Sequence, residues 1–318
     1  LYYTSIPIDG QRQGMRAHTA TLVGDRIWFI GGVTAKHCRR DVEYYDTCTL
    51  EWNVVETGGE LLPPLRAHTT NLVGDKLYIF GGGDGPTYSN EVWIFDTLTY
   101  RFSRPILTTP KHSLPPPRRA HTTVLYQNFL VVFGGGNGQA ALNDVWALDV
   151  SDSDRLSWHE WPTRGSPPQK KGYHTANLVG EKMVVFGGSD GHASFADVHV
   201  LNLETLTWTL LNTELKYNRL SHTSTAIGSY LFMLGGHNGQ SYAQDVLLFN
   251  LVTLQWESRT PGGVPPPGRG YHAALVHDAR IYVSGGYNAV SVFDDLWALE
   301  LGASAYLPQV VSSAQALC

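Results

Sequence analysis

The chain has 318 residues, and its 23 Lys and Arg against 28 Asp and Glu give a formal net charge of -5. This balance argues against a protein that binds nucleic acid by neutralising phosphates, and the 42% hydrophobic content excludes intrinsic disorder. Only 16% of the residues are charged while Gly (33) and Trp (9) are abundant, which is typical of short strands joined by tight turns.

Four markers repeat six times along the chain, at intervals of about 51 residues. Each repeat has a pair of adjacent glycines, whose first members are Gly31, Gly81, Gly134, Gly187, Gly235 and Gly285. A histidine lies 13 residues before each pair: His18, His68, His121, His174, His222 and His272. An acidic residue lies 10 residues after the first glycine: Asp41, Glu91, Asp144, Asp197, Asp245 and Asp295. An aromatic residue follows: Trp52, Phe102, Trp158, Trp208, Trp256 and Tyr306.

Each repeat predicts four strands, as the second repeat illustrates. The first strand follows His68, and the turn Gly74-Asp75 joins it to the apolar run 76–80. Gly-Asp between two such runs is a strong hairpin signal, because both residues tolerate positive φ. The third strand starts near Glu91 and a short fourth strand lies at the aromatic residue. No window shows a helical apolar stripe, so the sequence predicts an all-β protein.

Six such units can cover their apolar faces by packing radially, which predicts a six-bladed β-propeller with four antiparallel strands in each blade. We expect one domain over 1–306, a C-terminal tail over 307–318 and a double-glycine geometry that leaves no room for side chains between blades. The predicted repeats are about 9–58, 59–109, 110–164, 165–213, 214–261 and 262–306.

Closure of the ring needs an outer strand for the last blade, since an open ring exposes a sheet edge. Trp52 precedes the next repeat histidine by 16 residues, and counting back 16 from His18 reaches Tyr2. The segment 2–8 is therefore expected to complete the last blade. Tyr306 competes for the same place, but Pro308 disfavours that alternative.

The pattern of His-Thr before an apolar strand, a double glycine, an acidic residue followed by Val and a late Trp resembles the kelch repeat. The likeness covers about residues 2 to 306. The amino-acid sequences of segments such as 66–69, 133–138 and 305–310 are most similar to fungal kelch-repeat proteins of cell polarity and Ras-pathway signalling. They are also similar to kelch adaptor proteins of ubiquitin ligases. The resemblance implies a partner-binding domain, often joined to other modules, and we expect no enzyme activity.

Some kelch proteins are enzymes, so the alternative is a galactose-oxidase-like or mutarotase-like propeller that binds a sugar or another small ligand in its central pocket. Copper-radical chemistry needs a Cys cross-linked to a Tyr, and neither Cys38 nor Cys48 belongs to a matching motif. The repeat histidines share one register, which indicates a structural hydrogen bond in every blade. The sequence therefore predicts no catalytic residue, metal or cofactor.

Strand direction predicts that the loops after the double glycines and the loops between blades gather on one face, and long loops on a rigid scaffold often carry function. A cation lies just before each repeat histidine, and we expect all six at the central opening: Arg16, Arg66, Arg119, Lys171, Arg219 and Arg269. Further candidates lie in the same loops: Lys36, Arg39, Arg40, Tyr88, Tyr242 and His192.

These cations have two possible roles. They form ion pairs with the repeat acids and brace the blades, or they form a positive funnel that captures an acidic segment through bidentate contacts. For Tyr88 and Tyr242 the alternative to partner contact is packing between blades. The expected partner is a protein, either an acidic segment or a folded signalling protein such as a small GTPase or its regulator. Neither nucleic acid nor membrane insertion is expected.

The first repeat departs from the others, because 33–40 replaces the usual Asx-Gly turn after the glycines. We expect a partner to exploit this irregularity. The odd number of cysteines (3) favours free thiols and a cytoplasmic protein. Residue 1 is Leu, so we expect a piece or a processed form of a longer protein, with a propeller that is itself monomeric.

Overall fold

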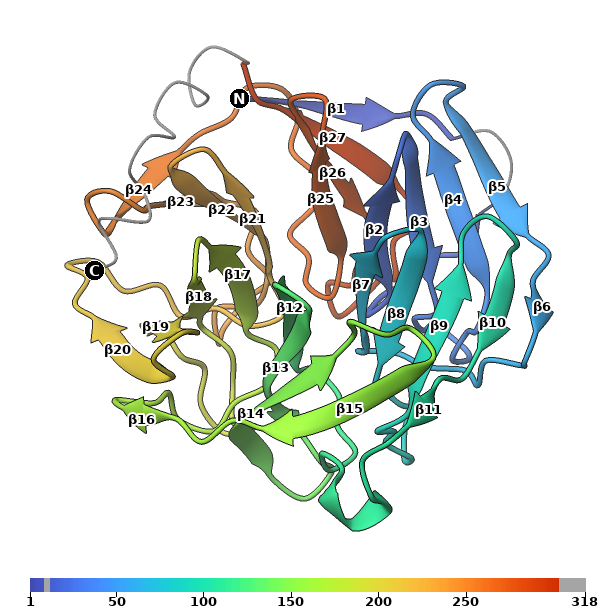
Figure 1. Ribbon diagram of the computed structural model, residues 1–318. Helices are drawn as coiled ribbons and strands as arrows, with labels where there is room; N and C mark the ends of the chain where they lie inside the picture. Colours follow the sequence, from blue (N-terminus) through green and yellow to red (C-terminus); the bar gives the residue numbers. More distant parts are fainter. Residues whose placement is uncertain (9–11, 303–318) are drawn as a thin grey trace.

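A computed structural model describes residues 1–8 and 12–302, and it is an all-β propeller of six sheets around one axis (Figure 1). Each sheet has four antiparallel strands, which we number from the axis outward, so the predicted fold class is confirmed. The only helical element in the described residues is a single 3-10 turn, η1 (Lys111–Ser113), between the second and third blades.

The first three blades follow the chain in order. Blade 1 contains β2 (Thr19–Val23), β3 (Arg26–Ile30), β4 (Val42–Asp46) and β5 (Glu51–Val55). Blade 2 contains β7 (Thr69–Val73), β8 (Lys76–Phe80), β9 (Val92–Asp96) and β10 (Arg101–Ser103). Blade 3 contains β12 (Thr122–Tyr126), β13 (Phe129–Gly136), β14 (Ala141–Asp149) and β15 (Arg155–Glu160).

The other three blades repeat the arrangement. Blade 4 contains β17 (Thr175–Val179), β18 (Lys182–Phe186), β19 (Val198–Asn202) and β20 (Thr207–Leu211). Blade 5 contains β21 (Thr223–Ile227), β22 (Tyr230–Leu234), β23 (Val246–Asn250) and β24 (Gln255–Arg259). Blade 6 contains β25 (Ala273–His277), β26 (Arg280–Ser284), β27 (Leu296–Glu300) and, as its outer strand, β1 (Tyr2–Ile6).

Three blades carry an extra two-residue strand that the sequence did not predict. These strands are β6 (Gly58–Gly59), β11 (Ile106–Leu107) and β16 (Arg164–Gly165), and each pairs in parallel with the outer strand of blade 2, 3 or 4. Each lies in the segment that enters the blade from its predecessor. They cover the edge of the outer strand, which is the part of a blade most exposed to unwanted pairing.

The N-terminal strand closes the ring as predicted: β1 lies antiparallel to β27 (Figure 1). The residue that takes the place of the repeated aromatic is Tyr3 rather than Tyr2. Tyr3 is opposite Leu299 and 5% exposed, whereas Tyr2 is 57% exposed. The count of 16 residues fails by one here because the segment between β1 and His18 differs in length from the other inter-blade segments. The competing Tyr306 lies outside the described residues.

The core is divided into six clusters, each between two neighbouring blades. The repeated aromatic fills the wedge between blades, as predicted. Trp158 of blade 3, for example, packs against Phe80 of blade 2 with 4.7 Å between ring centroids. Trp208 and Trp256 repeat this contact with Phe133 and Phe186. Each blade therefore buries its two faces against its two neighbours.

The double glycines allow the second strand of one blade to approach the next blade closely. At Gly187 a Cβ atom would lie 2.3 Å from the carbonyl oxygen of Arg219, and at Gly188 a Cβ would lie 2.8 Å from that of Gly172. Both glycines have positive φ, 67° and 95°. Any other residue would clash with the backbone and be strained, as the sequence predicted.

The six repeat histidines form a buried layer. Each Nε2 atom except that of His18 lies 2.9–3.2 Å from the hydroxyl of a threonine on the preceding blade, as in the pairs Thr19–His68 and Thr175–His222. Ala273 stands where the sixth threonine would be, so His18 has no such bond. Burial lowers the pKa of His68, His174 and His272 to about 3 and those of the other three well below 6.5.

A closed ring of six backbone hydrogen bonds surrounds the axis. Its members are the residues just before the repeat histidines: Ala17, Ala67, Ala120, Tyr173, Ser221 and Tyr271. Each donates its N–H to the carbonyl oxygen of the member on the preceding blade, at 2.7–2.9 Å, and the bond from Ala17 to Tyr271 completes the circle. All six have a φ of 53° to 59°. We call this the hydrogen-bonded ring.

The described residues contain no helix that is long and apolar enough to cross a membrane.

Candidate partner-binding surface

The loops after the double glycines and the segments between blades meet on one face, as predicted. Antiparallel backbone bridges join them, for example Arg66 to Gly83 and Gly172 to Ser189. We call this the loop-rich face. At its centre the axis opens into a cavity of ≈ 120 Å³, which we call the mouth. The hydrogen-bonded ring fixes the backbone around the mouth, so side chains decide its chemistry.

Three of the six predicted cations line the mouth. Arg16, Arg66 and Arg119 stand two residues before their histidines, on blades 1, 2 and 3, and we call them the arginine half-ring. Arg16 lies over the ring of Tyr287 at 4.1 Å, and Arg119 lies over that of Tyr88 at 4.7 Å. Within residues 1–8 and 12–302, no carboxylate forms an ion pair with any of these three guanidiniums.

The expectation that all six cations ring the opening is wrong for Lys171, Arg219 and Arg269. These three stand one residue earlier, three before the histidine, and their side chains are buried. Each forms a short ion pair with the acidic residue of its own repeat, such as Arg219 Nη1 with Asp245 Oδ1 at 2.7 Å. They brace the blades through ion pairs, which is the first of the two roles considered for these cations. A shift of one residue reverses the direction of a side chain along an extended segment.

Repeat 3 has both kinds of arginine, side by side. Arg118 is a brace: its side chain is 0% exposed and its two Nη atoms donate to the two Asp144 oxygens at 2.8 and 2.7 Å. Arg119 belongs to the half-ring. In blades 1 and 2 the brace position holds Met15 and Leu65, which are buried and apolar. Braces therefore occur in blades 3–6, and half-ring arginines in blades 1–3.

Arg39 was also predicted as a partner contact, and this is wrong. It is 8% exposed, and its guanidinium lies between Asp41, at 2.7 Å, and Glu43. Glu43 in turn accepts a hydrogen bond from the Trp52 indole at 3.1 Å. Arg39 therefore takes over in blade 1 the bracing that Met15 cannot provide.

The remaining candidates lie on the loop-rich face. Lys36, Arg40 and His192 are exposed on loops away from the mouth. Tyr88 is half-buried beneath Arg119. Tyr242 is half-buried against His237, with 4.8 Å between ring centroids, and burial raises its pKa to about 12.

Opposite the arginine half-ring, the mouth is aromatic. Tyr173 and Tyr271 meet edge to face with centroids 5.6 Å apart. At the half-ring position itself, blades 4–6 have Gly172, Leu220 and Gly270 instead of arginine. The sequence reasoning missed these two tyrosines, although a signal existed: the position before the histidine is Ala, Ala, Ala, Tyr, Ser, Tyr in the six repeats.

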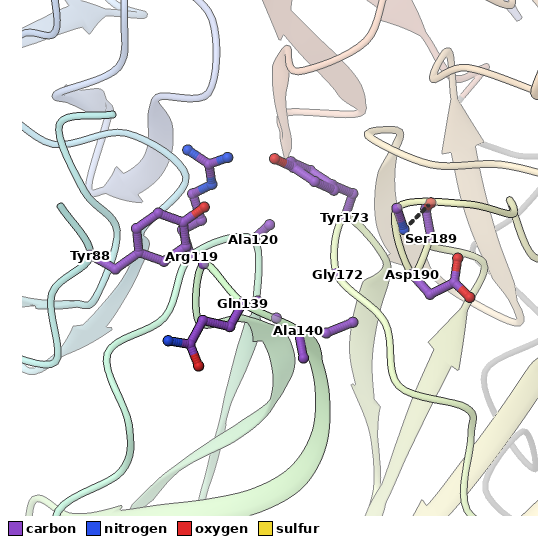
Figure 2. A pocket seen from close by; sticks show the side chains of 14 residues that line it. Tyr88, Arg119, Ala120, Gln139, Ala140, Gly172, Tyr173, Ser189 and Asp190 are labelled. Carbon is purple, nitrogen blue, oxygen red and sulfur yellow. Dashed lines mark hydrogen bonds between the residues drawn. The ribbon is translucent and has the colours of Figure 1, made fainter. Parts of the chain in front are cut away.

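A second cavity, of ≈ 260 Å³, lies beside the mouth between blades 3 and 4, and we call it the off-axis pocket. Figure 2 shows Tyr88 and Arg119 on one side of this pocket, Ser189 and Asp190 on the other, and Gln139 and Ala140 between them. Arg119 and Tyr173 line both cavities, so the two lie next to each other at these side chains.

The described residues contain no group of three or more His, Cys, Asp or Glu side chains arranged to hold a metal ion. The repeat histidines are buried and, in five blades, bound to threonine hydroxyls, which explains their common register without a ligand role.

Comparison with known proteins agrees with this architecture. The family described as the KLHDC2/KLHL20/DRC7 Kelch-repeats domain matches residues 2–152 and 106–286, so the chain belongs to the kelch-repeat proteins. The expectation drawn from the sequence is confirmed at this level.

Similar proteins come from animals and an alga. Human Kelch domain-containing protein 3 is 31% identical over 203 residues, which are 58% of this chain and 52% of that protein. Human Host cell factor 2 is 34% identical over 121 residues, 32% of this chain and 15% of the relative. The flagellar outer-arm dynein alpha chain of Chlamydomonas reinhardtii is 29% identical over 194 residues, 59% of this chain and 3% of the relative. The chain therefore matches about half or less of the length of these relatives.

Proposed function

We propose that this propeller is a non-catalytic protein-interaction module that docks an acidic segment of a partner protein at the mouth. The observation that carries this proposal is the arginine half-ring: three guanidiniums line one small cavity without an acidic partner among the described residues. The protein as a whole is negative, with a charge of -5, so this positive site is a local feature.

The contrast with the brace cations supports a binding role. Every brace cation lies within hydrogen-bond distance of a carboxylate, such as Lys171 Nζ at 2.7 Å from Asp197. Arg16 and Arg119 instead contact the faces of Tyr287 and Tyr88, and Arg119 also donates to a backbone carbonyl at 3.4 Å. Apart from the buried Nε of Arg16 and the Arg119 Nη that donates to this carbonyl, their N–H groups are available to carboxylate oxygens, with which arginine makes strong bidentate hydrogen bonds.

The surroundings of the half-ring suit recognition of a protein. The hydrogen-bonded ring holds the arginine backbones in place, so little ordering entropy is lost on binding. Tyrosine and arginine, which dominate the mouth, are the residues that contribute most to protein interfaces. Lys36, Arg40 and His192 are exposed on the same face and extend the contact surface for a folded partner.

The partner class follows from the sequence resemblance and not from the site. This resemblance implies a small GTPase, or a regulator of one, as the partner that presents the acidic segment. The cysteine content favours the cytoplasm as the place of this interaction.

Panning a random peptide library against the purified domain tests the proposal. We expect enrichment of peptides with two or more acidic residues, and binding that weakens with added salt because the contact is electrostatic. Arg66→Glu should reduce the affinity for an enriched peptide at least about tenfold, since a like charge replaces an attractive one.

Arg155→Glu is the matched control, because Arg155 is exposed at the start of β15 and makes the same change in net charge away from the mouth. Thermal unfolding should show that both variants fold. Selection of peptides without acidic residues, or equal binding by both variants, would contradict the proposal.

A further inference from the structure

Gly172, at the half-ring position of blade 4, leaves the off-axis pocket without a side chain at this point. Gly172 lines the pocket, and a Cβ built on it would lie 3.3–3.5 Å from Ala120 and Gly135, which line it too. The equivalent residues of blades 1, 2 and 3 are arginines and that of blade 5 is Leu220. A side chain at position 172 would therefore project into the space that the pocket occupies.

The floor of the pocket is apolar, although it is largely backbone. Gly135, Gly136 and Gly172 each donate their N–H groups to carbonyl oxygens of neighbouring segments, at 2.8–2.9 Å. The N–H of Ala120 is bound within the hydrogen-bonded ring. Ala120, Ala140 and Ala141 line the pocket beside these glycines.

The walls are aromatic and cationic. Tyr88 packs beside Gly138, where an added Cβ would lie 3.7 Å from its ring, and it carries the Arg119 guanidinium on its face. Tyr173 stands across from them (Figure 2). At the rim, one oxygen of the Asp190 carboxylate accepts hydrogen bonds from the N–H groups of His192 and Ala193, at 2.8 Å each.

The size of the pocket selects among occupants. At ≈ 260 Å³ it lies below the range of about 300–1,000 Å³ that holds a drug-sized ligand or cofactor. A single large side chain fits this space. An aromatic ring suits it best, because it stacks against the two tyrosines and offers its π face to Arg119.

We propose that the off-axis pocket binds an aromatic side chain of the same partner segment whose acidic residue lies on the arginine half-ring. This inference rests on the proposed function and narrows it. Because Arg119 and Tyr173 line both cavities, the acid and the aromatic ring lie close together in the partner. The recognised segment is therefore extended, with an aromatic residue within a few residues of an acidic one.

A small probe that joins the two groups is 3-phenylpropionate, which carries a carboxylate and a phenyl ring on a two-carbon linker. Propionate and benzyl alcohol supply each group alone. Ligand-observed NMR titration of the purified domain should give an affinity for 3-phenylpropionate about tenfold or more above that for propionate, as expected from burial of a phenyl ring.

Two substitutions locate the effect. Gly172→Leu fills the pocket with the side chain that blade 5 already carries at this position, and it should remove the advantage of the phenyl group while propionate binding persists. Tyr88→Leu should weaken 3-phenylpropionate about threefold to tenfold, by loss of an aromatic contact. The control is Tyr126→Leu, because Tyr126 is a half-buried tyrosine at the end of β12 that lies outside both cavities.

The outcomes separate this inference from the proposed function. If propionate and 3-phenylpropionate bind equally and Gly172→Leu changes neither, the aromatic site is refuted while the acidic site stands. If neither carboxylate binds and the peptide selection also shows no acidic preference, the proposed function fails and the inference fails with it. Loss of the phenyl advantage in Gly172→Leu and Tyr88→Leu, with Tyr126→Leu unchanged, supports the aromatic site.

Discussion

The two halves of the mouth have the same backbone and opposite chemistry. Blades 1–3 contribute Arg16, Arg66 and Arg119, whereas blades 4–6 contribute small or apolar residues at the same position and the Tyr173–Tyr271 pair next to it. The hydrogen-bonded ring runs through both halves without interruption. The backbone is thus similar in all six blades, but the positive charge of the mouth comes from blades 1–3 alone. This difference arises from the side chains one or two residues before the repeat histidines.

The largest expected effect is acid unfolding, which tests whether the two halves of the propeller unfold together. The six repeat histidines are neutral and buried in the folded protein, with pKa values far below 6.5. Unfolded histidine titrates near about 6.5, so the unfolded state binds more protons below that pH and stability falls as the pH drops. At a pH of about 5.5 the loss is about 1.4 kcal/mol for each histidine.

Because all blades share this layer, we expect one cooperative transition between about pH 5 and pH 6. Circular dichroism and tryptophan fluorescence should follow the same curve. Two separate transitions would show that the halves unfold independently. The halves would then differ in stability as well as in the side chains that line the mouth.

The pairing of β1 with β27 in blade 6 closes the ring, so it tests whether the propeller unfolds as one unit. Tyr3→Ala should destabilise the protein by about 3–4 kcal/mol, because it empties a buried wedge between blades 5 and 6. Tyr2→Ala at the exposed neighbour should change the free energy of unfolding by less than about 0.5 kcal/mol. Urea denaturation measures both, and similar values for the two variants would refute the assignment of Tyr3 to the aromatic place.

Two adjacent arginines sharpen the distinction between bracing and binding. Arg118→Ala should cost about 3 kcal/mol of stability, since it breaks a buried ion pair with Asp144. Arg119→Ala should cost about 1 kcal/mol or less, through the lost contact with Tyr88, and should weaken acidic-peptide binding. Denaturation and peptide titration of the two variants should give opposite rankings, and equal rankings would contradict the division of roles.

The smallest expected effect lies at the seam between blades 6 and 1. Ala273→Thr supplies the hydroxyl that His18 lacks and should stabilise the ring by about 1 kcal/mol. Thermal unfolding detects a change of this size, and the control Ala274→Thr places the hydroxyl one residue away on β25. Equal shifts for both variants would show that the missing bond at His18 does not limit stability.

Much of this molecule could be predicted from its sequence because the repeat overdetermines it. Six copies of glycine pairs and histidines fix the number of blades and the strand order, whereas the closing strand was a choice between the two termini that Pro308 favoured toward the N-terminus. The position of a single residue within an irregular segment is less constrained. The length of the segment before His18 differs from that of its counterparts, and the aromatic place therefore fell to Tyr3 and not to Tyr2.

The sequence predicted the positions of only some candidate residues correctly. Arg66 and Arg269 are both cations just before a histidine, and a separation of two residues against three decides whether each lines the mouth or is buried against an acid. Arg39 shows the same limit, since its burial depends on Asp41 and Glu43. The off-axis pocket depends on the absence of a side chain at Gly172, which no motif marks.

The hydrogen-bonded ring has a consequence for how specificity can change. Its six members donate and accept through the main chain alone, so alanine, serine and tyrosine occupy it equally well. Exchanging side chains at these places alters what the aperture attracts without altering its diameter. A few substitutions at these places can thus change which ligand a kelch propeller of this kind binds, while the backbone ring is kept.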